Sequence, residues 1–275
     1  MSKALLDANF PRLIDGKTMH LNVLEGDVNP RILSVGDAGR GERISSYLEN
    51  LQIINSTRGF ITYSGTFEGV PVSIIVTGMG IPMMDFVVRE ATSVISSKVA
   101  MIRLGTCGAL KPNTKPGSII LASSSRFISQ NYSYPVGPAY NLSSKVHSDP
   151  DLFTIFKNQL ISIFGSENVD EGVDLTCETF YSAQGRKDPR FDDCNENLIE
   201  NMVVEEPEAA AMEMETFKLL HLASTSKGKI AATACMIGLL NRHTQELMDF
   251  SKLHDIERDA ARAALMALIR YPLDN

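Results

Sequence analysis

The stretch that decides the fold is VAMIRLGTCG, residues 99–108. Its first half is a run of apolar residues typical of a buried strand over Val99–Leu104, ending at Gly105. An arginine one residue before the end of such a strand is costly unless an anion pairs with it. Arg103, with the hydroxyl and backbone N–H of Thr106, therefore looks like half of a phosphate site. The alternative is an ion pair between Arg103 and an Asp or Glu at the edge of the core.

Two further predicted strands end in glycine turns. Arg31–Val35 is followed by Gly36, and Val70–Thr77 by a Gly-Met-Gly turn. Short apolar runs predict two more strands, over Ser118–Ala122 and Ile230–Ile237. The strands alternate with helical patterns, so we expect an α/β fold, with helices on both faces of a mixed sheet. Ligands of such folds bind beyond the carboxyl ends of the strands, where the three glycine turns converge.

Helical spacing of apolar residues marks the segments between the strands. The predicted helices include Ile44, Tyr47, Leu48 and Leu51 after the first strand, Pro82–Ser97, a helix capped by Asp149, Glu208–Ser224, and about Ser251–Arg270. One polar and acidic segment, Arg186–Glu208, has few periodic apolar residues. It is predicted to be a long surface loop, with a functional lid as the alternative.

Composition limits the function classes. The chain has 275 residues and no internal repeat, a size that suits one large α/β domain or two small ones, and we expect a single three-layer α/β/α domain. A net charge of −7 argues against a broad nucleic-acid surface, which needs clustered Lys and Arg. The four cysteines show no metal spacing, so we expect reduced thiols and no metal. The chain has no apolar leader and no run of eighteen apolar residues, so we predict a cytoplasmic protein that does not contact membranes.

The turn after the first strand reads GDAGR, residues 36–40. Glycine lets the backbone approach an anion, the N–H groups at the start of the next helix point outward, and Arg40 adds a fixed positive charge. The motif is neither GxGxxG nor a P-loop, so it implies no dinucleotide and no ATP. Taken alone, such a segment is more often a simple turn.

Two glutamates flank Met214 in the EME motif, residues 213–215, within the predicted helix Glu208–Ser224. Carboxylates on an otherwise small and apolar segment need partners. The two hydroxyls of a ribose can both donate to one carboxylate, and this suits Glu215. Solvent exposure of one of the two glutamates is the alternative.

The segment TFYSAQGR, residues 179–186, combines groups that could recognise a planar base. The ring of Phe180 can stack on the base, and the amide of Gln184 can pair with a group that both donates and accepts. The guanidinium of Arg186 can donate to carbonyl oxygens. Uracil presents such an edge with O2, N3–H and O4, whereas a purine needs a donor aimed at N7.

These motifs together resemble the uridine phosphorylase branch of the nucleoside phosphorylase family. GDxxR, RxGTxG, FYxxQxR, EME and Leu240-Asn241-Arg242 occur in the family's order, from about His20 to the last helix. FYxxQxR is the motif of the pyrimidine-specific branch. The resemblance implies reversible phosphorolysis of uridine to uracil and α-D-ribose 1-phosphate, without a cofactor. It also implies one domain over residues 1–275, whose N-terminal extension (1–25) joins a subunit interface in a homo-oligomer with shared active sites.

The resemblance also implies a role for each matched residue. The implied phosphate ligands are Gly36, Arg40, Arg103, Thr106 and, from a neighbouring subunit, Arg58. The implied ribose ligands are Met214, Glu215 and the neighbour's His20. The base would meet Cys107, Gly108, Phe180, Gln184, Arg186 and Leu240, with Arg242 supporting Gln184 from behind. Arg103, Thr106, Gln184 and Arg186 are the implied catalytic residues.

Three positions depart from the family. Ala38 stands where Pro is common, Cys107 replaces a common Thr, and Gly59 replaces a glutamate that belongs to a monovalent-cation site in bacterial members. We therefore do not predict the ion. Three other functions stay open: a purine or broad-specificity phosphorylase, a nucleoside hydrolase, and an inactive nucleoside-binding protein. Hydrolysis would leave the three arginines without a purpose, and an inactive protein would not be expected to keep them.

Overall fold

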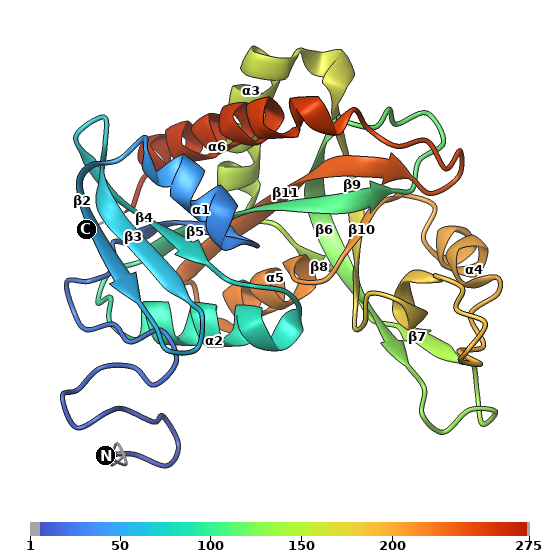
Figure 1. Cartoon of the computed structure of the whole chain (residues 1–275), viewed down its shortest axis with the longest axis horizontal. Coiled ribbons are helices and arrows are strands. Elements are labelled where there is room, and N and C mark those ends of the chain that lie inside the picture. Colours follow the sequence, from blue (N-terminus) through green and yellow to red (C-terminus); the bar gives the residue numbers. More distant parts are fainter. Residues whose placement is uncertain (1–5, 274–275) are drawn as a thin grey trace.

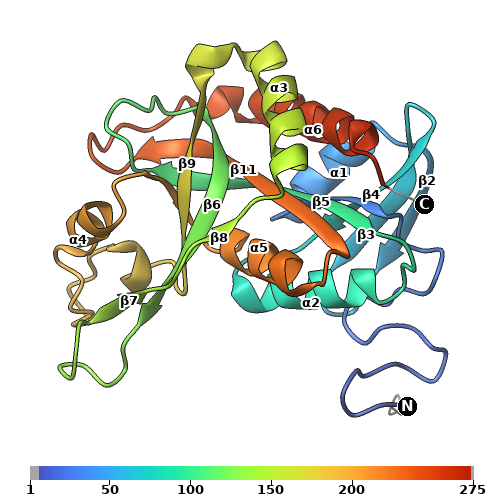
Figure 2. The same cartoon turned by 180° about the vertical axis from the view of Figure 1, so that it is seen from behind.

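The computed structural model describes residues 6–273 and has eleven strands in one mixed sheet (Figures 1 and 2). The strands are β1 (Arg31–Val35), β2 (Glu49–Asn55), β3 (Ile61–Phe67), β4 (Val70–Val76), β5 (Val99–Ala109), β6 (Ile119–Gln130), β7 (Tyr140–Leu142), β8 (Val146–His147), β9 (Val169–Cys177), β10 (Ala209–Glu213) and β11 (Ile230–Asn241). They follow the order β10-β9-β6-β11-β5-β1-β4-β3-β2, and β7 and β8 pair with β6.

Helices cover both faces of the sheet, as Figure 1 shows. They are α1 (Ala38–Ser45), α2 (Ile81–Thr92), α3 (Pro150–Phe164), α4 (Leu198–Glu205), α5 (Thr216–Thr225) and α6 (Leu253–Arg270). Buried residues of α1, α3 and α6 form one core with the sheet, and those of α2 and α5 form a second core on its other face. The predicted three-layer α/β/α fold is confirmed. None of the helices within residues 6–273 is long and apolar enough to cross a membrane.

Part of the sheet closes on itself. β10 pairs in parallel with β9 and also antiparallel with β5, so β5, β11, β6, β9 and β10 form a ring. Small buried side chains such as Ala109, Ala122, Ala211 and Ala234 pack together in this region. Because β1, β4, β5 and β11 run parallel, their carboxyl ends lie at one edge of the sheet. That edge is where ligands of open α/β sheets bind.

Most predicted elements are present. β1 has the predicted bounds, and Asp149 caps α3 by accepting from the backbone N–H of Leu152 at 2.9 Å. β5 and β11 run further than predicted, because their mutual ladder continues through Gly105 and Cys107. The stretch 105–108 is therefore part of β5 and not a turn after it.

Three predictions about elements were wrong. Residues 209–213 form β10 and not a helix, because pairing with β9 and β5 outweighs the helix propensity of three consecutive alanines. Leu51 lies in β2, whose pairing with β3 ends the helical region before it. Arg186–Glu208 is not all loop, since it contains α4, whose buried Leu198 and Met202 pack in a core with Ala183. Two buried side chains on eight residues give too weak a periodic signal to predict.

Candidate active site

A cavity of about 470 Å³ lies at the carboxyl edge of the strands. It gathers all of the predicted site residues except His20, Arg58 and Arg242. These are Gly36, Arg40, Arg103, Thr106, Cys107, Gly108, Phe180, Gln184, Arg186, Met214, Glu215 and Leu240. The cavity therefore joins the two arginines at one end to the aromatic and amide groups of residues 180–186 at the other.

The first end of the cavity is built by β1 and α1. Asp37 caps α1, and its carboxylate accepts from the backbone N–H of Arg40 at 2.8 Å. The Arg40 side chain is buried and donates from Nη1 to the carbonyl of Leu104 at 3.4 Å. Its Nε donates to Glu257 of α6 at 2.8 Å. This end can hold an anion, because a guanidinium and the start of a helix lie side by side.

Arg103 of β5 also lines the cavity and is almost fully buried. It donates from Nε to Glu213 at 3.3 Å and from Nη2 to Glu215. Burial alone would lower the pKa of Arg103, but these two carboxylates outweigh it and raise that pKa. The alternative of a core-edge ion pair is therefore present in the ligand-free protein. Nη1 of Arg103 is also buried and has no hydrogen-bond partner among the described residues.

Glu213 is buried and accepts a hydrogen bond from Arg103, so the alternative that one glutamate of the EME motif is solvent-exposed does not hold for it. It accepts from the backbone N–H groups of Glu215 and Thr216 at 2.9 Å each, at the start of α5. The Thr176 hydroxyl donates to it at 2.7 Å. Burial opposes ionisation of Glu213, but Arg103 and these donors prevail and lower its pKa. Glu213 therefore stays ionised and holds Arg103 against β10.

Glu215 faces the cavity and accepts from the backbone N–H of Gly80 as well as from Arg103. Gly80 has φ +93, a conformation that glycine adopts without strain, and it belongs to the turn that follows β4. Burial is the main cause that raises the pKa of Glu215 to about 7, Arg103 opposes it, and Glu213 adds to it. This carboxylate can therefore bind a pair of hydroxyl donors or a proton.

The other end of the cavity is formed by residues 180–186. The Arg186 guanidinium lies 4.1 Å from the centre of the Phe180 ring, and its Nη2 donates to the Gln184 amide oxygen at 3.4 Å. Phe180 is 45% exposed, so one face of its ring is free for a planar ligand. Asn195 holds the loop from behind by donating to the carbonyls of Ser182 and Arg186 at 2.9 and 3.0 Å. Burial lowers the pKa of Arg186.

Three predicted residues lie outside the cavity. Arg242 donates from Nη2 to the backbone carbonyl of Gln184 at 2.9 Å. His20 contacts Glu90 at 2.5 Å and stacks on Phe86 at 4.0 Å. Arg58 is exposed, and the Ser56 hydroxyl links its backbone to that of His20. His20 and Arg58 are thus neighbours, away from their own chain's cavity.

Some cavity residues were not singled out as ligands from the sequence. They are Asp37, Gly78, Met79, Met212, Glu213, Leu239 and Phe250. The GDAGR, Gly-Met-Gly and EME motifs contain or adjoin most of them, so a signal existed. Phe250 lies beyond any motif and had none. No group of three or more His, Cys, Asp or Glu within residues 6–273 is arranged to hold a metal ion.

Comparisons with known proteins identify solved structures that share this fold. A solved structure from work on two uridine phosphorylases of the oomycete Phytophthora capsici is 35% identical, covers 98% of this chain and 100% of that one, and has a TM-score of 0.94. A Trypanosoma brucei nucleoside phosphorylase described as showing uridine phosphorylase activity is 19% identical with a TM-score of 0.82, covering 95% of this chain and 100% of that one, and shares the fold.

A relative from Oceanobacillus iheyensis, a DeoD-type purine nucleoside phosphorylase, is 28% identical over 214 residues, 75% of this chain and 81% of that protein. The family model of the phosphorylase superfamily matches residues 30–271. The expected resemblance to nucleoside phosphorylases is therefore confirmed, and the chain belongs to the phosphorylase superfamily.

Proposed function

We propose that the protein is a uridine phosphorylase, a pentosyltransferase that converts uridine and phosphate to uracil and α-D-ribose 1-phosphate. The observation that carries the proposal is one cavity lined by Arg40, Arg103, Glu215, Gln184 and Arg186. The high structural similarity to a uridine phosphorylase supports the same reading.

In this proposal phosphate binds at Gly36, Arg40, Arg103 and Thr106. The arginines, both of which line the cavity, hold the dianion beneath C1′ of the ribose. As the glycosidic bond lengthens, positive charge develops on the ribose ring, and the phosphate stabilises it and then bonds to C1′ with inversion. Catalysis comes from positioning and from charges that are already oriented, without a covalent enzyme intermediate or a cofactor.

Glu215 and Met214 would bind the ribose, whose two hydroxyls replace Arg103 or Gly80 as donors to the Glu215 carboxylate. The base would stack on Phe180 and contact Cys107, Gly108 and Leu240. Burial raises the pKa of the Cys107 thiol far above neutral, so Cys107 serves as a neutral wall of the pocket and not as a nucleophile. Gln184 and Arg186 would stabilise the negative charge that grows on uracil O2 and the ring amide as the bond breaks.

A purine nucleoside phosphorylase is the second candidate, because purine enzymes are among the sequence relatives. The base end argues against it, since Gln184 and Arg186 match the edge of uracil. The deciding assay incubates the protein with uridine or inosine, with and without phosphate, and follows release of the free base. Phosphate-dependent release of uracil is expected. Faster release of hypoxanthine would support the purine function, and release without phosphate would indicate a hydrolase.

A shared active site is part of the proposal. His20 and Arg58 lie together on the surface and outside the cavity, so a neighbouring subunit would bring them to the phosphate and to the ribose 5′ hydroxyl. Residues 1–25 would then contribute to that interface in at least a dimer. The four cysteines are free thiols, which fits the reducing conditions of the cytoplasm, where this reaction would serve pyrimidine salvage.

A further inference from the structure

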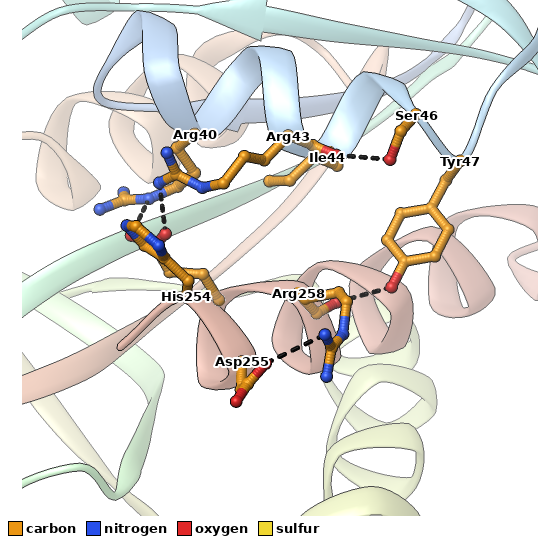
Figure 3. Close-up of a pocket in the computed structure, with 9 residues that line it drawn as sticks. Arg40, Arg43, Ile44, Ser46, Tyr47, His254, Asp255 and Arg258 are labelled. Atoms are coloured by element: carbon orange, nitrogen blue, oxygen red, sulfur yellow. Dashed lines mark hydrogen bonds and ion pairs between the residues drawn. The ribbon is translucent and has the colours of Figure 1, made fainter. Parts of the chain in front are cut away.

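A second cavity of about 310 Å³ lies on the other side of Arg40 from the candidate active site. It is lined by Arg40, Arg43, Ile44, Ser46, Tyr47, His254, Asp255, Glu257 and Arg258. Figure 3 shows Arg40 and Arg43 reaching from α1 toward the start of α6. Arg40 lines both cavities, whereas Glu257 lines only the second. Arg40 therefore connects the second cavity to the active site.

Glu257 makes the strongest contacts with Arg40. Its carboxylate is 3% exposed, accepts from Arg40 Nε at 2.8 Å with one oxygen, and accepts from Arg43 Nη2 at 2.6 Å with the other. Arg40 is also buried, whereas the Arg43 side chain is 42% exposed. A charge-assisted hydrogen bond between two buried groups fixes geometry more firmly than one at the surface. Glu257 thus ties the guanidinium of Arg40 to α6.

The hydrogen bond from Arg40 Nε to Glu257 also orients the rest of the Arg40 guanidinium. The group is planar, so a partner at Nε fixes the plane in which Nη1 and Nη2 lie. Nη1 lies toward the first cavity, since a Cβ placed on Gly36 would be 3.9 Å from it. Asp37 is a weaker second partner, 3.5 Å from Nη2 and 54% exposed. The terminal nitrogens are thereby presented to the proposed phosphate site.

We propose that Glu257 is a positioning residue for phosphate, acting through Arg40. The inference rests on the proposed function, because it needs Arg40 to bind phosphate. Glu257 contacts no substrate in this proposal. It holds Arg40 in the orientation that the anion requires, so that little ordering is needed when phosphate binds.

The test measures phosphate and uridine kinetics for Glu257→Ala, Glu257→Gln, Arg40→Ala and the double variant Arg40→Ala/Glu257→Ala. Glu257→Ala is expected to raise KM for phosphate about tenfold, the size of one lost charge-assisted contact, with KM for uridine little changed at saturating phosphate. Glu257→Gln should have a smaller effect, because its amide can still accept from Arg40 but must turn an N–H group toward Arg43. In the Arg40→Ala background, Glu257→Ala should add nothing, as coupled residues do in a mutant cycle.

Glu206→Gln is the matched control. Glu206 is a buried glutamate with two cationic partners, Arg126 at 3.3 Å and Lys145 at 3.1 Å, and it does not line the active-site cavity. The Glu206→Gln variant should lower the melting temperature, as Glu257→Gln does, and leave KM for phosphate unchanged. The rise of melting temperature with added inorganic phosphate gives a readout without catalysis, and it should shrink in the Glu257 and Arg40 variants but not in Glu206→Gln.

Different outcomes overturn different claims. If the wild-type protein does not release uracil in a phosphate-dependent way, the proposed function fails. If it does and Arg40→Ala leaves KM for phosphate unchanged, phosphate does not bind at Arg40, and the role of Glu257 falls with it. If Arg40→Ala raises that KM while both folded Glu257 variants do not, or if the effects of the two substitutions simply add, the positioning role alone is wrong.

Discussion

Arg103 has two roles. It pairs with Glu213 and Glu215, and it is proposed to bind phosphate. Arg103→Ala should reduce turnover about 100-fold or more, since it removes a charge that stabilises the transition state. It should also lower the free energy of unfolding by about 3–5 kcal/mol, because buried carboxylates lose their partner. Steady-state kinetics at saturating phosphate and urea denaturation measure the two effects.

Arg126→Ala is the control for Arg103→Ala. Arg126 also pairs with two glutamates, Glu205 and Glu206, and lies outside the active-site cavity. It should lower stability and leave the turnover of the folded protein near normal. Unchanged turnover in a folded Arg103→Ala variant would contradict the phosphate-site assignment.

Glu215 gives the ligand-free protein a pH-dependent stability. Its pKa is about 7 in the fold against an ordinary value of 4.5, so the folded protein binds the extra proton between these values. Proton binding by Glu215 contributes fully to the free energy of unfolding below pH 4.5. This contribution is lost as pH rises through about 7, by at most about 1.4 kcal/mol for each pH unit. Melting temperatures of wild type and Glu215→Gln across pH 5–8 test this. The difference between the two should change over that window, and a constant difference would show that Glu215 does not titrate there.

Single motifs made much of the site predictable, because strand-end glycines, buried arginines and the FYxxQxR residues have chemistry that can be read locally. Partners distant in sequence were not predictable. Glu257 lies 217 residues after Arg40, and only the packing of α6 on α1 brings them together. The burial of Glu213 likewise depends on β10, a strand whose sequence predicts a helix.

At the scale of elements, α1 carries Arg40 and can be tested at its first residue and in its interior. Asp37 precedes the helix with φ −135 and ψ 156, an extended conformation that a following proline allows. Ala38 is the first helical residue, where proline is favoured. Ala38→Pro should therefore raise the melting temperature by about 1–3 °C, by restricting the unfolded chain. A lower melting temperature by calorimetry would mean that the turn needs the Ala38 N–H.

Gly41→Ala is the opposing variant in the same helix. Alanine ordinarily stabilises a helix interior relative to glycine. Here its Cβ would lie 2.6 Å from Val76 Cγ2 and 3.2 Å from Tyr63 Cε2, so α1 must move away from the sheet. A loss of about 1–3 kcal/mol is expected by denaturant unfolding, with weaker phosphate binding because Arg40 is the adjacent residue. A stabilised variant would show that this contact is easily relieved.

At the scale of the whole molecule, the central prediction concerns the shared site. Arg58→Ala and Arg186→Ala subunits, each nearly inactive alone, should recover activity when mixed. A mixed dimer has one site with both residues intact and one lacking both. Random exchange makes half of the dimers mixed, so the recovery should reach about a quarter of wild-type activity. Mass-tagged subunits establish that exchange has occurred.

Mixing Arg103→Ala with Arg186→Ala provides the control, because both residues line the cavity of the same chain. Every site in that mixed dimer still has one defect, so no recovery is expected. If the first pair exchanges subunits and stays inactive, Arg58 is not donated across an interface.

The layered architecture was predictable because strands and helices alternate along the chain. The closed ring of strands was not predictable, because it depends on the pairing of β10 with both β9 and β5. It also depends on the close approach of residues 208–210 to Gly172 of β9. A Cβ there would lie 2.6 Å from Ala210 Cβ and from the Glu208 carbonyl oxygen. In the sequence, such contacts between distant strands are visible only as a preference for small residues. Some of these, such as the alanines at 209–211, also favour helices.

The half-exposed Phe180 ring has an optical consequence. The chain contains no tryptophan, so the protein has no indole fluorescence of its own. Phe180→Trp would place the only indole of the molecule at the position proposed to contact the base, beside the Arg186 guanidinium. Its emission would report when a base arrives and departs, separately from phosphate, in stopped-flow records of a single turnover.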